Sequence, residues 1–308
     1  MVVNMPSVSI GLPVFNGEKY LRRALDSILA QTYQDFELII SDNASTDKTQ
    51  QICREYAKRD GRISYYRSER NFGAAWNYNR VFKLSSGVYF EWIAHDDVIA
   101  PEFVSRCVNV LEREPSIVLC HSKTARINED NVVVGTYDIG RVTDSRKPHE
   151  RFRDLLSRKG FPWMIFGVFR RDALSMTQIL REYIGSDWNL LAEISLIGRI
   201  YEIPKYLFFR RDHPDAYTNR HYSKDVIVHN YRKESVWWTG NKRRALIVWP
   251  YWRNCLEFFK SVRRAQLKWS ERWLCCEEIS RWILREGWEL MKWDLANELQ
   301  LWRIKLNC

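Results

Sequence analysis

The feature of this sequence that most constrains its fold is a regular alternation of short apolar runs with helical patterns between residues 7 and about 213. Apolar runs of strand length occupy residues 8–14, 36–40, 63–66 and 88–93. Between the first two runs, apolar side chains recur at the spacing of one helix face, from Tyr20 to Leu29. This alternation predicts an α/β protein with a mainly parallel sheet that helices cover on both faces.

Further helices are expected between the later strands. The polar turn at 42–47 predicts a helix cap, followed by a helix that runs to about Ala57. Another helix is expected over 73–84. A third is expected to begin at Pro101, because the first turn of a helix tolerates proline.

The character of the chain changes after about residue 223. Ten of the 14 tryptophans lie in 224–308, together with 17 Lys and Arg against 10 Asp and Glu. Glycine and proline are scarce there, so we expect helices over about 224–238, 242–264 and 267–304, the last interrupted near Gly287. The sequence therefore predicts a boundary at 220/221, with an all-helical region over 221–308.

Composition and charge narrow the class of protein. A 45% share of hydrophobic residues is typical of a globular chain, and the net charge of +10 points to an anionic partner or to a solubilising surface. No apolar run of membrane-spanning length is present, and Met1 to Ser7 lacks the pattern of a secretory signal. The seven cysteines form no CxxC pair, so we expect neither a disulfide framework nor a zinc site. This cysteine usage favours a cytoplasmic protein.

Polar clusters follow three of the predicted strands, at the edge where doubly wound sheets bind ligands. They are Asn16-Gly17-Glu18, Asp42-Asn43 and His95-Asp96-Asp97. The sequence contains neither a GxGxxG after the first strand nor a GxxxxGK[ST], which argues against dinucleotide dehydrogenases and P-loop NTPases.

The acids at these strand ends have two interpretations each. Adjacent carboxylates at Asp96 and Asp97 repel each other, and a hard cation such as Mg²⁺ or Mn²⁺ bound with diphosphate oxygens would relieve this. Alternatively, one of the pair caps the helix expected at Pro101. Asp42 in turn suits either a ligand contact or a simple Asx turn.

Taken in order, these segments resemble the family 2 glycosyltransferases. The resemblance covers about 7–120 strongly and 160–215 loosely. It is carried by SIGLPVFNGEKYL at 9–21, LDSILAQTY at 25–33, FELIISDNASTD at 36–47, NFGAAWN at 71–77, and His95-Asp96-Asp97 followed by Pro101-Glu102.

The resemblance implies a GT-A fold, in which helices cover a doubly wound, mainly parallel α/β sheet. It also implies a nucleotide-sugar donor and inversion at the anomeric carbon. It implies a catalytic domain over 1–220, with a donor-binding half at about 7–120 and an acceptor-side half at about 121–220. The donor residues would be Pro13 and Phe15 at the base pocket, Glu18 facing the nucleoside, Asp42 hydrogen-bonded to the base, and Asn71. Asp96 would lie near the ribose and the metal, and Asp97 would coordinate Mn²⁺ or Mg²⁺. This chain has Ala94 where many members carry a further acid.

The catalytic base is predicted from GSDWNLLAE at 185–193, which resembles the acid-acid motif at the start of the family's acceptor-side helix. Ser186 replaces the first acid, and Asp187 matches the second, the general base. A carboxylate at a helix start can reach an acceptor hydroxyl. The alternative is that Ser186 or Asp187 only caps the helix, and Glu193 is the reserve base, expected to face solvent or Arg199.

Cationic and imidazole groups follow a further apolar run at 206–209. Arg210 would offset the charge of the diphosphate leaving group, and His213 would ligate the metal. The family often carries a basic or His-containing loop here. The alternative for His213 is a structural role.

The C-terminal region has two interpretations. Tryptophans interleaved with basic residues suit an anionic membrane interface. Alternatively, the tryptophans pack the helices against the catalytic domain, or against a second copy of the chain in a homo-oligomer. We predict a metal-dependent transferase that moves sugar from a UDP-sugar to a glycan or lipid-linked sugar acceptor, in polysaccharide or glycolipid synthesis. The enzyme is expected in the cytoplasm or at the inner face of the membrane, and no nucleic acid is expected as a partner. The rival classes are an inactive scaffold of this fold, a nucleic-acid binder, and a nucleotidyltransferase, which would need a Gly-rich basic loop after the first strand.

Overall fold

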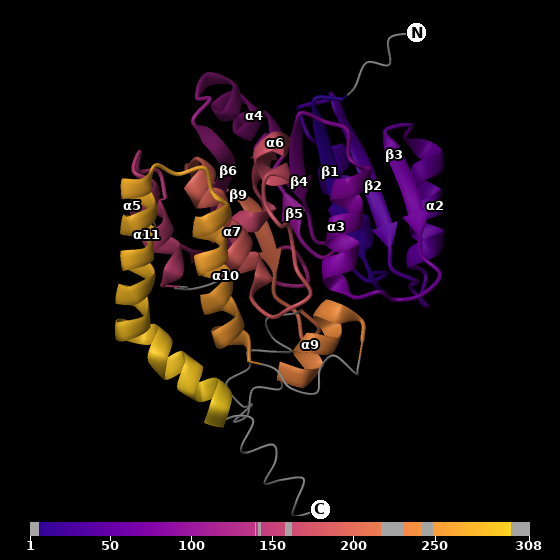
Figure 1. Cartoon of the computed structure of the whole chain (residues 1–308). Coiled ribbons are helices and arrows are strands. Elements are labelled where there is room, and N and C mark those ends of the chain that lie inside the picture. The colour runs from indigo at the N-terminus through magenta and orange to yellow at the C-terminus, as the bar shows by residue number, and fades with distance from the viewer. Residues whose placement is uncertain are drawn as a thin grey trace, which may run out of the picture.

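The computed structural model describes residues 6–138, 140, 143–157, 162–216, 231–241 and 249–296. Within these residues, nine strands form one mixed sheet, in the order β3-β2-β1-β4-β8-β6-β9-β5, with β7 paired to β6 (Figure 1). The prediction of a doubly wound α/β fold of the GT-A type with a C-terminal helical segment is confirmed.

The first half of the sheet is parallel, as the alternating pattern predicted. It contains β1 (Val8–Val14), β2 (Phe36–Asp42), β3 (Ile63–Arg67) and β4 (Tyr89–Trp92). The intervening helices are α1 (Leu21–Leu29), α2 (Thr49–Arg59) and α3 (Ala74–Leu84). Side chains on β2 alternate between two cores, so helices cover both faces: Leu38 packs with α1 and α2, whereas Ile39 packs with α3.

The second half of the sheet is mixed. Antiparallel β8 (Val168–Arg170) joins β4 to β6 (Ile117–Ile127), and β9 (Arg199–Arg211) runs parallel to β6. The short β5 (Val98–Ile99) pairs antiparallel with β9, with Val98 opposite Phe209. This register brings the residues just before β5 beside those at the end of β9. The hairpin strand β7 (Val133–Tyr137) extends β6.

The remaining helices lie around this second half. They are α4 (Phe103–Arg113), α5 (Pro148–Leu156), the 3₁₀ turn η1 (Trp163–Phe166), α6 (Arg171–Ser175) and α7 (Ser186–Ile197). The helix expected at Pro101 begins instead at Phe103, because Pro101 lies in the turn before it, where its carbonyl accepts a hydrogen bond from the Thr32 amide at 2.8 Å.

The described parts of the C-terminal helices lie within the predicted ranges, apart from Thr239 at the end of the first one. They are α9 (Tyr231–Thr239), α10 (Pro250–Arg264) and α11 (Trp269–Trp282), and α11 continues into the π-helical turn η3 (Ile283–Gly287), the interruption expected near Gly287. The predicted helical residues 224–230, 242–248 and 297–304 lie outside the described residues. The boundary at 220/221 also lies there and stays a prediction.

The tryptophans of this region divide between the two interpretations. Trp238 and Trp282 are 4% and 5% exposed and belong to the core that α3, α5 and α7 also build. Trp269 and Trp273 are 79% and 60% exposed on α11. In the part of the chain that the structure describes, no helix has the length and apolar character needed to cross a bilayer.

Candidate active site

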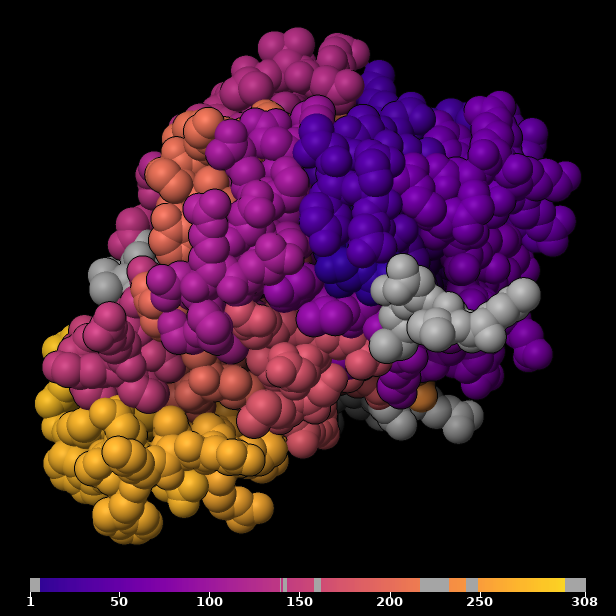
Figure 2. Space-filling model, turned by 90° about the horizontal axis from the view of Figure 1, so that it is seen from above, coloured from indigo at the N-terminus to yellow at the C-terminus, as the bar shows by residue number. Residues whose placement is uncertain are grey.

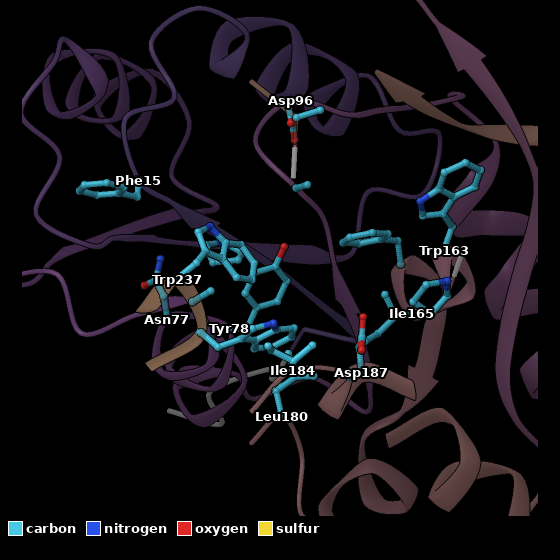
Figure 3. A pocket seen from close by; sticks show the side chains of 18 of the residues that line it. Phe15, Asn77, Tyr78, Asp96, Trp163, Ile165, Leu180, Ile184, Asp187 and Trp237 are labelled. Atoms are coloured by element: carbon cyan, nitrogen blue, oxygen red, sulfur yellow. The ribbon is translucent and has the colours of Figure 1, made fainter. Parts of the chain in front are cut away.

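A cavity of about 1190 Å³ opens at the carboxyl ends of β1 and β4 and reaches the first turn of α7 (Figure 3). Residues of the α/β region and of the C-terminal helices α9 and α10 both line this cavity, although the sequence predicted them as separate regions. Eight predicted site residues line this cavity: Pro13, Phe15, Asn71, Asp96, Asp97, Asp187, Arg210 and His213.

The acidic pair lies in the turn between β4 and β5, nearly buried beside the cavity. Asp97 is 4% exposed, and its Oδ1 accepts a hydrogen bond from the Arg211 amide at 2.8 Å. Asp97 therefore does not cap α4, which begins without any side-chain cap. Burial and repulsion from Asp96 raise the pKa of Asp97 well above its ordinary value.

Asp96 is held in its charged form by two imidazoles. Burial would raise the pKa of Asp96, but the charge of His95 and the hydrogen bond from His213 outweigh it and lower this pKa to about 2. The His213 Nε2–Asp96 Oδ2 distance is 2.9 Å, and the His213 ring packs on Tyr20. Among the described residues, no cluster of three or more His, Cys, Asp or Glu side chains forms a ready metal site.

The end of β9 supplies two arginines with different surroundings. Arg210 lines the cavity, pairs with Asp212 and lies over the Trp163 ring, 5.7 Å from its centroid. Arg211 is fully buried, and its Nε donates to the Asp96 carbonyl at 2.8 Å. Arg211 therefore holds the acidic turn in place, a role that the sequence did not reveal.

Asp187 lies in the first turn of α7, on the side of the cavity opposite Asp96 in Figure 3. The N-cap of α7 is Gly185, in a left-handed conformation with φ 82°, and no side chain caps the helix. The alternative that Ser186 or Asp187 is the N-cap is therefore wrong. The Asp187 Oδ1 accepts the Trp188 amide at 2.9 Å. Burial raises the pKa of Tyr78, and the charges of Asp96, Asp97 and Asp187 raise it further. The Tyr78 side chain therefore lies within electrostatic reach of both acidic groups.

Glu193, the reserve base, faces neither solvent nor Arg199. It is 4% exposed, and its Oε1 accepts a hydrogen bond from Arg264 Nε of α10 at 2.8 Å. On the same helix, Asn189 Nδ2 donates to the Asn254 carbonyl of α10 at 3.2 Å. The expectation was wrong because α10, which is distant in sequence, packs along α7. Arg199 pairs with Asp144 instead.

Two predicted donor residues do not line the cavity. The Asp42 carboxylate is fully buried, with Oδ1 accepting the Ser45 amide and Oδ2 accepting the Tyr65 hydroxyl, each at 2.8 Å. This is the Asx-type turn that the sequence left open. Glu18 is exposed, and its Oε2 accepts the Lys48 amide at 2.8 Å, at the start of α2. Contacts of Asp42 and Glu18 with a nucleoside stay predictions.

Two asparagines that were not predicted as site residues, Asn43 and Asn77, also line the cavity. Asn43 binds the loop before α3: its Nδ2 donates to Asn71 Oδ1 at 2.9 Å, and its Oδ1 accepts the Phe72 amide at 3.0 Å. Asn77 Nδ2 donates to the Ser41 carbonyl at 2.9 Å. Asn77 closes the quoted NFGAAWN segment, so its position was a usable signal. No local signal marks the lining residues Trp163, Trp237, Tyr251, Glu286 and Glu289.

Comparisons with known proteins identify the family and the fold of this chain. The family model described as "Glycosyl transferase family 2" matches residues 9–177. An uncharacterized glycosyltransferase of Rickettsia typhi is 40% identical over 228 residues, which cover 70% of this chain and 66% of the relative, so the chain spans just under two thirds of that protein.

Two solved structures share the fold at low identity. Staphylococcus aureus TarS 1–349 in complex with UDP has a TM-score of 0.62 and 16% identity, over 91% of this chain and 72% of TarS. The mannosyltransferase PcManGT of Pyrobaculum calidifontis, in complex with GDP-Man and Mn²⁺, has a TM-score of 0.54 and 14% identity, over 98% of this chain and 88% of the other. Because this family model spans more than half of its length, the chain belongs to glycosyl transferase family 2.

Proposed function

We propose that this chain is an inverting glycosyltransferase that moves a sugar from a UDP-sugar to a hydroxyl of a glycan or lipid-linked sugar. The observation that carries the proposal is the pair Asp96 and Asp97 on one side of a cavity that has Asp187 on the other. The choice of nucleotide is supported by TarS, which was crystallised with UDP and with UDP-GlcNAc. A role in polysaccharide or glycolipid synthesis is part of the same proposal.

The size of the cavity supports a two-substrate reaction. Sites for one small molecule typically enclose about 300–1,000 Å³. At about 1190 Å³, this cavity exceeds that range, so a donor and the reacting end of an acceptor fit together. Holding both substrates in one site makes the reaction effectively unimolecular.

The proposed reaction is a single displacement. Asp187 accepts the proton of the acceptor hydroxyl as its oxygen forms a bond to the anomeric carbon. The bond from that carbon to the diphosphate oxygen breaks on the opposite face, and the nucleoside diphosphate leaves with the electron pair. Arg210, which is held by Asp212 at the edge of the cavity, provides positive charge near the departing group.

The acidic pair fits a divalent cation. Burial and repulsion from Asp96 raise the pKa of Asp97, and a cation beside the two adjacent carboxylates would relieve both effects. Asp96, Asp97 and His213 do not form a three-ligand cluster by themselves, so they would hold Mn²⁺ or Mg²⁺ only together with the diphosphate oxygens of the donor. When bound, the ion would neutralise charge on the diphosphate.

A panel of nucleotide sugars tests the proposal. We expect one UDP-sugar, with Mn²⁺, to raise the melting temperature of the full chain by roughly 5 °C at 100 times its Kd. ADP-ribose serves as a control diphosphate with a different base. If no nucleotide sugar changes the melting temperature at any concentration, with or without Mn²⁺, the proposed function is wrong.

We also propose that α11 contacts an anionic membrane surface. Trp269, Trp273 and Leu284 are 79%, 60% and 85% exposed, and Lys268 and Arg285 are adjacent to them in sequence. The helices α10 and α11 form a lobe at the edge of the molecule, yellow in Figure 2. Indole rings beside basic groups suit the headgroup region of a bilayer.

Vesicle co-sedimentation checks this contact. We expect salt-sensitive binding to vesicles that contain phosphatidylserine, because an anionic surface attracts basic segments. A Trp269→Ser, Trp273→Ser double variant should bind at least about tenfold more weakly, since burying a large apolar side chain contributes about 1.5–3 kcal/mol. Tyr206→Ser, at a 40% exposed ring on β9, is the matched control. Unchanged binding by the double variant, or no binding at low salt, would refute the contact.

A further inference from the structure

Two glycines bring α9 into direct backbone contact with the loop before α3. Gly73 and Gly240 both have positive φ, 90° and 63°. A Cβ built on Gly240 would lie 2.6 Å from the Gly73 nitrogen, and one built on Gly73 would lie 2.4 Å from the Gly240 nitrogen. Real Cβ contacts are longer than 3.0 Å, so only glycine fits at either position.

The surface that receives α9 is fixed. Asn43 Nδ2 donates to the Gly73 carbonyl at 3.1 Å, and Asn43 itself follows the last residue of β2. At the end of α9, Thr239 Oγ1 donates to the Ser235 carbonyl at 2.8 Å and accepts the Asn241 amide at 3.1 Å. Hydrogen bonds therefore hold both segments that meet at the two glycines. The glycine contact then determines the position of α9.

Both tryptophans of the docked helix line the cavity, and the first of them is the more exposed. Trp238 is 4% exposed and belongs to the same hydrophobic core as Val81 of α3. Trp237 is 38% exposed and lines the cavity, with its ring edge-on to Trp238 at 5.2 Å. In Figure 3, Trp237 lies at the end of the cavity where Phe15 and Asn77 are labelled, away from Trp163.

That end of the cavity follows β1. Phe15 is 42% exposed, so two large, partly exposed aromatic rings line a largely apolar cavity. A planar, uncharged group is the chemistry that such surfaces recognise, and a nucleobase stacks well on aromatic rings. Sugar and diphosphate would then extend toward Asp96 and Asp187.

We propose that Trp237 is a base-stacking residue of the donor site, and that the contact between Gly73 and Gly240 positions it. This inference rests on the proposed function, because it takes the ligand to be a nucleoside diphosphate. It makes the C-terminal helical region part of donor binding, although the family model ends at residue 177.

Calorimetric titration of the full chain with UDP and with GDP, in the presence of Mn²⁺, tests the inference. Trp237→Ala should weaken the better nucleotide by at least about tenfold, and Trp237→Phe should restore most of the affinity. Gly240→Ala should cause a similar loss, because its Cβ must push α9 away from Gly73. Trp293→Ala, at a 54% exposed indole that is not part of the cavity lining, is the control.

The outcomes separate the inference from the proposed function. If the unmodified chain binds nucleotide and Trp237→Ala binds it equally well, the inference is wrong and the proposed function stands. An effect of Trp237→Ala on the acceptor KM alone, with the nucleotide Kd unchanged, also overturns the inference. If the unmodified chain binds no nucleotide, the proposed function itself fails. Trp237→Ala decides the question even if Gly240→Ala does not fold.

Discussion

Replacing Asp187 with Asn is expected to lower sugar transfer by at least about 10²-fold, whereas nucleotide affinity and melting temperature should stay close to those of the unmodified chain. A general base contributes roughly 10²–10⁴-fold to rate, which is about 3–5 kcal/mol of barrier. The Asn side chain has the size of Asp but cannot take the proton from the acceptor hydroxyl. Release of nucleoside diphosphate during turnover measures the rate.

The comparison with Asp187→Ala separates catalysis from helix stability. Asn retains an oxygen that can accept the Trp188 amide, as Asp187 Oδ1 does at 2.9 Å, and Ala loses it. We expect Ala to lower the melting temperature slightly and Asn to leave it unchanged, with both equally inactive. Near-normal transfer by the Asn variant would show that another group is the base. Glu193 is a poor substitute, because it is buried against Arg264 and outside the cavity lining.

Asp97→Asn should abolish the dependence of nucleotide binding on a divalent cation. The Asn side chain keeps an acceptor for the Arg211 amide, so the turn between β4 and β5 should keep its shape. Replacing a partner outside the ligand shell already costs 10–100-fold in metal affinity, so loss of a direct ligand should raise the Kd of nucleotide with Mn²⁺ by at least about 100-fold.

Chelation provides the second half of this test. With EDTA, the unmodified chain should bind nucleotide as weakly as the Asp97→Asn variant does, and the variant should not respond to EDTA. Asp144→Asn, at an acid that pairs with Arg199 away from the cavity, should behave like the unmodified chain. Nucleotide binding that is equally tight with chelator and with Mn²⁺ would exclude Asp97 as a metal ligand.

The parallel half of the fold was predictable because its signals are local. The apolar run at 8–14 coincides with β1, and the run at 36–40 differs from β2 only by its last two residues. Burial on both faces of the sheet requires continuous apolar strands, so the pattern is strong. The carboxyl-end position of Asp96 and Asp97 followed from the same alternation.

The rest of the site depends on pairings between distant segments, which no local pattern encodes. The resemblance placed His213 near the acids, but the hydrogen bond to Asp96 arises from the pairing of β5 with β9. Likewise, nothing in the sequence distinguishes Arg211 from an exposed cation, whereas its side chain is completely buried in the structure. The contribution of Trp237 depends on a glycine contact across 167 positions of chain, from Gly73 to Gly240.

The contacts between α7 and α10 tie the proposed base to the C-terminal helices. Glu193 with Arg264, and Asn189 with Asn254, join the helix that carries Asp187 to a segment after residue 249. A chimaera that takes its C-terminal helices from a family member without a cation at position 264 would leave the Glu193 carboxylate buried without its partner, which destabilises strongly. Such a graft should therefore succeed only when residues 185–197 are exchanged together with 249–296. Across natural homologues, we expect Glu193 and Arg264 to change as a pair.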